Sequence, residues 1–163
     1  MRLSTAAAVS IAVFLLFAQN SVAASAQAKP QWAPLDSSYL RSVYADKTWM
    51  WRHGAAYFGK DGVFKARTRA KGVVTVAFGA WNVPADGRMC FSASWRAVPD
   101  PDPSSAPPVK ETCFTHDAKG RKIAQMREPD GKWYVFKHAQ TRNGDEIRKL
   151  RAGDHTGLKS PDA

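Results

Sequence analysis

The sequence predicts a mainly β protein: an antiparallel up-and-down meander of seven or eight strands, forming a lipocalin-like barrel or a strongly curved sheet, with one short N-terminal helix. Between residues 48 and 138, short segments rich in Val, Phe, Tyr and Trp alternate with turns that contain Gly, Asp or Pro. No helical periodicity separates these segments, so consecutive strands are expected to pair as antiparallel neighbours. The expected strands are 48–51, 55–58, 63–68, 73–83, 88–95, 113–116, 121–127 and 132–138.

Other local patterns complete this expectation. A helix is expected at 35–45, where apolar residues recur at helical spacing and Asp36 can cap the first turn. Alternate residues of 73–83 are small, which permits close backbone approach or a cavity on that face. The segment 97–109 holds half of the ten prolines. It is therefore expected to be a long exposed loop.

The N-terminus has the organisation of a cleavable signal peptide over residues 1–26. Arg2 supplies a positive start, an apolar run follows, and small residues lead to a favoured cut after Ala26. An uncleaved anchor is the alternative, but the apolar run of about 13 residues is shorter than the ~20 needed to span a bilayer. We therefore expect a periplasmic or secreted protein with no transmembrane anchor. A flexible leader (27–34), one domain (35–154) and a flexible tail (155–163) would follow the signal peptide.

The two cysteines, Cys90 and Cys113, are expected to form a disulfide, because exported proteins fold in an oxidising compartment. The bond would join two neighbouring strands at the base of the proline-rich loop. A reactive thiol or a metal site is the alternative, but only His116 stands at ligand-like spacing from Cys113. No cofactor or metal ion is expected.

Several short aromatic and glycine-containing motifs occur along the chain. They include Thr48-Trp-Met-Trp51, Gly54-Ala-Ala-Tyr57-Phe58, Gly87-Arg-Met-Cys90-Phe91, Cys113-Phe-x-His116 and Trp133-Tyr-x-Phe136. In combination they are similar to an uncharacterised family of exported alpha-proteobacterial proteins, known as a domain of unknown function. The resemblance covers about residues 35–154 and implies a periplasmic or secreted single domain with no activity attached. The Gly-x-Trp and Tyr-Phe elements are also similar to lipocalin-like barrels, at the level of the fold alone.

Basic and aromatic residues are the candidates for ligand binding. The formal net charge of +10 favours anionic partners. Six tryptophans could fill the core, wall a pocket or stack on sugars, and alternation places Trp49 and Trp51 on one face of a strand. The ligand-binding candidates are Trp49, Trp51, Arg52, His53, Arg67, Arg69, Trp81, His116 and His138.

No catalytic motif or metal-ligand spacing is present in the sequence. We therefore expect a monomeric, non-catalytic binding protein for an anionic or amphipathic cell-envelope component: an anionic glycan, a lipid headgroup or an envelope protein, and not nucleic acid. One alternative is a protein-interaction module, such as an inhibitor or assembly factor of an envelope enzyme, that uses the proline-rich loop. Another is an enzyme based on His116 or His138, with Asp117 or Glu128 as the orienting carboxylate.

Overall fold

A computed structural model describes residues 31–84, 87–102, 104–105 and 107–159. The expected signal peptide (1–26) lies outside the described residues, as do 27–30 of the expected leader and 160–163 of the expected tail. No helix within the described ranges is long and apolar enough to cross a membrane.

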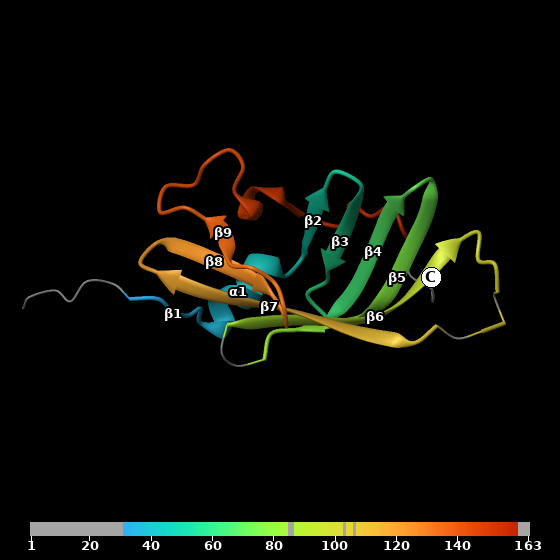
Figure 1. Ribbon diagram of the computed structural model, residues 1–163, viewed down its shortest axis with the longest axis horizontal. Coiled ribbons are helices and arrows are strands. Elements are labelled where there is room, and N and C mark those ends of the chain that lie inside the picture. Colours follow the sequence, from blue (N-terminus) through green and yellow to red (C-terminus); the bar gives the residue numbers. More distant parts are fainter. Residues whose placement is uncertain (1–30, 85–86, 103, 106, 160–163) are drawn as a thin grey trace, which may run out of the picture.

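In the described residues, ten strands form one antiparallel sheet that curls into a half-barrel (Figure 1). The elements are β1 (Ala33–Pro34), α1 (Ser37–Tyr44), β2 (Lys47–Trp51), β3 (Gly54–Phe58), β4 (Val63–Ala70), β5 (Val73–Asn82), β6 (Arg88–Val98), β7 (Val109–Lys119), β8 (Lys122–Arg127), β9 (Tyr134–Lys137), the 3-10 helix η1 (Glu146–Lys149) and β10 (Leu150–Ala152). Neighbouring strands follow chain order from β2 to β9, β10 pairs with β2, and β1 pairs with β7. The predicted β meander is therefore confirmed. The eight expected strands correspond to β2–β9, and β1 and β10 are short additions.

The predicted helix is confirmed as α1. The carboxylate of Asp36 caps it by accepting a hydrogen bond from the backbone N–H of Tyr39 at 2.9 Å. Leu40 and Tyr44 are fully buried on one side of the helix. The ring of Tyr44 packs edge-on against Phe58 of β3, with ring centroids 5.1 Å apart. We call the face of the sheet that α1 covers the inner face, and the opposite one the outer face.

Small residues of β5 allow aromatic rings to meet across it. Phe64 of β4 and Phe91 of β6 stack on the inner face, with ring centroids 4.3 Å apart. Gly79 of β5 is paired with Phe64 and carries no side chain that would separate the two rings. A Cβ atom at Gly79 would lie 2.0 Å from the carbonyl oxygen of Ser92. The expected close approach on this face of β5 is therefore confirmed.

The proline-rich loop is shorter than the predicted 97–109. Ala97 and Val98 belong to β6, where they pair with β5, and Val109 pairs with β6 as the first residue of β7. The loop therefore spans 99–108. These strand ends are held by pairing with residues distant in the sequence. The prolines next to them made the sequence predict a longer loop.

The predicted disulfide is formed. Cys90 of β6 and Cys113 of β7 are directly paired, with Cα atoms 4.1 Å apart, and both side chains are buried. Glu111 lies close enough to complete a cluster with metal-ligand geometry. Because both sulfur atoms are in the disulfide, this cluster does not offer thiolate ligands.

The chain after β10 is held against the outer face of β2 and β4. Thr48 donates a hydrogen bond to the carbonyl of Gly153 at 2.6 Å and accepts one from the backbone N–H of His155 at 2.9 Å. Lys65 forms an ion pair with Asp154 at 2.6 Å. The domain therefore continues past the predicted boundary at residue 154. Polar contacts hold this segment, and apolar periodicity in the sequence does not reveal them.

Candidate functional site

An open cavity of about 610 Å³ lies on the inner face of the sheet, and we call it the aromatic groove. Trp49 and Trp51 of β2 both line it, as their predicted common face requires. The stacked rings of Phe64 and Phe91 form another part of its wall. The remaining lining residues are Ala56, Phe58, Trp95, Lys110, Thr112, Phe114, Arg127 and Glu146.

The tryptophans of β2 differ in how firmly they are held. The ring of Trp49 packs edge-on against Phe114, with centroids 5.4 Å apart, and its Nε1 donates a hydrogen bond to Glu146 at 3.2 Å. Trp51 is 38% exposed although it lines the groove. A ligand in the groove could therefore contact the exposed part of the Trp51 ring.

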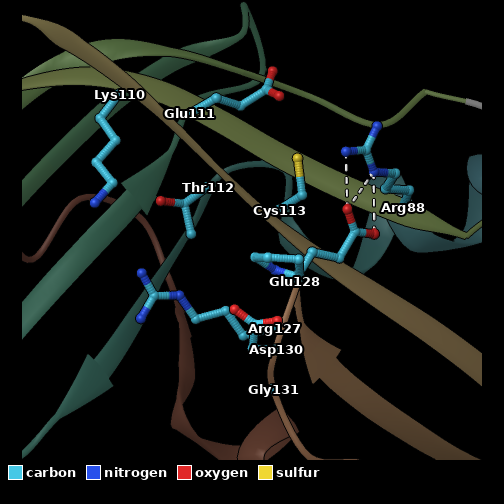
Figure 2. Close-up of a pocket in the computed structure, with 10 residues that line it drawn as sticks. Arg88, Lys110, Glu111, Thr112, Cys113, Arg127, Glu128, Asp130 and Gly131 are labelled. Carbon is cyan, nitrogen blue, oxygen red and sulfur yellow. Dashed lines mark hydrogen bonds and ion pairs between the residues drawn. The ribbon is translucent and has the colours of Figure 1, made fainter.

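A polar cleft of about 640 Å³ adjoins the aromatic groove, and Lys110, Thr112 and Arg127 line both. Figure 2 shows the side chains of Lys110 and Arg127 extending toward the same side, away from the ion pair of Arg88 and Glu128. These two cations therefore mark the border between the aromatic groove and the polar cleft.

The carboxylate of Glu128 already has partners within the protein. It accepts hydrogen bonds from Thr115 and from the Nε of Arg88, the latter at 2.9 Å. The hydrogen bond from Thr115, together with the charge and hydrogen bond of Arg88, holds the pKa of Glu128 below its ordinary value. Glu128 is therefore a paired anion that does not neutralise Lys110 or Arg127.

Among the described residues, three charged side chains line the aromatic groove: Lys110, Arg127 and Glu146. Glu146 is paired with Lys149, whose Nζ lies 2.5 Å from its carboxylate. Within the described part of the chain, neither Lys110 nor Arg127 forms an ion pair. The groove thus combines an apolar wall with two cations at one end, which is the chemistry that holds an amphipathic anion.

The basic candidates from the sequence lie elsewhere. Arg52, His53, Arg67 and Arg69 come together around a separate cavity of about 420 Å³, with His155. They share no lining position with the aromatic groove. Arg52 and His53 lie in the turn beyond Trp51, and they line this separate cavity and not the aromatic groove.

Trp81 and His116 are core residues. Trp81 is 3% exposed, and its Nε1 donates to the carbonyl of Gly59 at 2.7 Å. His116 is fully buried, with its Nε2 2.9 Å from both the hydroxyl of Tyr44 and the amide nitrogen of Gln125. Burial lowers the pKa of His116 to about 4, so the ring is neutral at physiological pH. Neither residue offers an atom to a ligand in the groove.

His138 pairs with Asp145, and not with the carboxylates expected from the sequence. Its Nδ1 lies 2.6 Å from Asp145, which also accepts hydrogen bonds from the backbone N–H groups of His138 and Arg142. Burial raises the pKa of Asp145, but these hydrogen bonds outweigh it and hold the pKa at about 2. Neither His138 nor Asp145 lines the cavities described here. His116 and His138 therefore have separate partners in the structure.

Comparison with known proteins places the chain in a family. A family model described as "Protein of unknown function (DUF995)" matches residues 12–156. No curated protein matches the chain, and no solved structure matches it. Since the family model covers most of the sequence, this half-barrel chain with an aromatic inner groove belongs to the DUF995 family of proteins of unknown function.

Proposed function

We propose that this chain is a non-catalytic, periplasmic or secreted protein that binds an anionic amphipathic component of the cell envelope in the aromatic groove. One observation carries the proposal: the groove joins an aromatic wall to two cations, Lys110 and Arg127, that have no ion-pair partner among the described residues. A volume of about 610 Å³ is within the range of ~300–1,000 Å³ for small-molecule sites.

The occupant we favour has a single apolar chain and an anionic headgroup. The apolar chain would lie against Trp51, Phe64 and Phe91, where it gains free energy by leaving water. The headgroup would lie at the border with the polar cleft, between Lys110 and Arg127. The net positive charge of the chain adds long-range attraction for such a ligand.

Calorimetric titration with dodecyl phosphate, below the concentration at which it forms micelles, tests this proposal. The double variant Lys110→Gln/Arg127→Gln should bind about tenfold more weakly, because two charge contacts are lost. The control Lys71→Gln/Arg121→Gln removes one Lys and one Arg at exposed positions that line none of these cavities. Its affinity should equal that of the wild type.

Three results would contradict the proposal. One is the absence of any heat of binding with dodecyl phosphate. Another is an equal loss of affinity in the two double variants, which would indicate only the effect of net charge. The third is that octaethylene glycol monododecyl ether, with the same apolar chain and a neutral headgroup that is not a saccharide, binds as tightly as dodecyl phosphate, which would leave no role for Lys110 and Arg127.

A protein-interaction role is the second candidate, and an open strand edge favours it. β7 pairs with β8 only from Phe114 onward, and the hydrogen bond from the Glu128 N–H to the Cys113 carbonyl lies at the end of this pairing. The backbone of Glu111, two residues earlier, therefore points in the same direction, and no strand of the described part of the chain lies beside it. An extended peptide could add there.

Site-specific crosslinking from Lys110 in cells tests this second candidate, with the adduct identified by mass spectrometry. Glu111→Pro removes the backbone donor of the open edge, whereas Glu111→Gln retains it. A discrete adduct with an envelope protein that survives Glu111→Gln and disappears with Glu111→Pro is expected if the edge binds a partner. An adduct that is the same in both variants would exclude pairing at this edge.

A further inference from the structure

A second aromatic cavity, of about 360 Å³, lies on the outer face of the sheet and is lined by Trp32, Asp117, Ala124 and Trp133. We propose that this cavity binds the ring of a neutral saccharide. It shares no lining residue with the aromatic groove, so the inference does not rest on the proposed function.

The strand register explains why these four residues meet. Asp117 of β7 is paired with Ala124 of β8. Trp32 stands two residues before the β1 partner of Asp117, and Trp133 stands two residues before the β9 partner of Ala124. Because alternate residues of a strand share a face, all four belong to the face opposite the buried His116. The cavity therefore extends across four strands or their immediate ends.

The two tryptophans present unused apolar surface. Trp32 is 42% exposed and Trp133 is 47% exposed. Among the described residues one other tryptophan, Trp51, is exposed, and it lines the aromatic groove. Ala124, between the two outer indoles, is too small to fill the space. A flat indole face suits the apolar C–H face of a pyranose ring, which also carries hydroxyl groups at its edge.

The polar groups of the cavity favour a saccharide over a charged ligand. Asp117 is half-buried, and no hydrogen bond or ion pair to its carboxylate is formed by the described residues. Its carboxylate can therefore accept hydrogen bonds from sugar hydroxyl groups. Lys122 places its Nζ 5.6 Å from the ring centroid of Trp32. That ammonium disfavours a cationic ligand, as Asp117 disfavours an anionic one, and it can donate to a sugar oxygen.

Proton–nitrogen correlation spectra of the indole N–H groups test the inference in the intact chain. The probes are N,N′-diacetylchitobiose and maltose, and single Trp→Phe variants assign the resonances. At least one disaccharide should shift the resonances of Trp32 and Trp133 in a saturable way. The resonance of Trp51 should stay in place. The resonance of Trp81, which is buried and hydrogen-bonded, reports that the fold is intact.

Matched variants show which of the two cavities binds the disaccharide. Trp133→Ala and Asp117→Asn should each weaken disaccharide binding about tenfold or more. Trp51→Ala, which removes an exposed indole from the other cavity, should leave it unchanged. The inference is overturned if neither disaccharide shifts Trp32 or Trp133, if the shift survives Trp133→Ala, or if tetramethylammonium chloride gives a tighter response than either sugar. Dodecyl phosphate is expected to shift the resonance of Trp51, whereas the disaccharides are expected to shift those of Trp32 and Trp133. This inference and the proposed function can therefore fail separately.

Discussion

Lowering the pH from about 7 to about 5 should destabilise the folded protein by about 2 kcal/mol through His116 alone. His116 titrates at about 4 when buried and at its ordinary value of 6.5 when the chain unfolds. Between these values the unfolded state binds more protons. The stability that the neutral, buried ring contributes is therefore complete above pH 6.5 and is lost as the pH falls toward 4. At a pH of about 5, a shift of this size corresponds to about 2 kcal/mol.

Urea unfolding followed by circular dichroism at both pH values measures this loss. The comparison is with His116→Gln, whose amide can still donate to and accept from Tyr44 and Gln125 but does not titrate. The variant should be less stable at neutral pH, because it packs less well, and it should lose about 2 kcal/mol less than the wild type on acidification. Equal losses in the two proteins would refute the assignment of the pH dependence to His116.

Three further predictions concern stability. Under oxidising conditions Cys90→Ser should cost about 3 kcal/mol, because the disulfide closes a loop with a sequence separation of 23; identical thermal melting of variant and wild type would contradict this. Gly79→Ala should cost about 1–3 kcal/mol in urea unfolding, since the new Cβ meets the carbonyl of Ser92, and a neutral effect would show that β5 and β6 can separate freely. Asp145→Asn should lower the melting temperature at neutral pH, and the difference from the wild type should shrink as the pH falls from about 4 toward about 2 in a circular dichroism titration; a difference that persists at low pH would refute the role of the carboxylate charge.

Most of the fold could be predicted because its signals are local. The pair Asp61-Gly62 predicts a tight turn, and Gly62 indeed has a φ of +89° between β3 and β4. The ends of β6 and β7 were harder to locate, because prolines adjoin them. Val98 precedes a proline and is extended for that reason as well as for its pairing with β5. A sequence alone does not show that such a residue also belongs to a strand.

The candidate site was only partly predictable. Strand alternation correctly placed Trp49 and Trp51 on one face. Lys110 and Arg127 were missed because their proximity depends on the register between β7 and β8, in which Phe114 pairs with Arg127. Extending the alternation back from Phe114 would have put Lys110 on the same face, had β7 been predicted to begin at its true start.

His116 was named as a candidate from the sequence but lies in the core. The sequence suggests a functional histidine at a strand end, but the structure surrounds it with Tyr44 and Gln125 in the core. Gln125 is nine residues away in sequence and is brought opposite His116 by the β7–β8 hairpin. From the sequence alone, a buried polar residue whose hydrogen-bond partners come from distant parts of the chain looks the same as a ligand-binding residue.

The most direct test of the aromatic groove is the indole N–H spectrum recorded during a titration with dodecyl phosphate. We predict saturable shifts of the resonances of Trp49 and Trp51, which line the groove, while those of buried Trp81 and outer-face Trp133 keep their positions. Uniform small shifts of all these resonances, or a response confined to Trp133, would contradict the claim that the inner face of the half-barrel is the binding site for amphipathic anions.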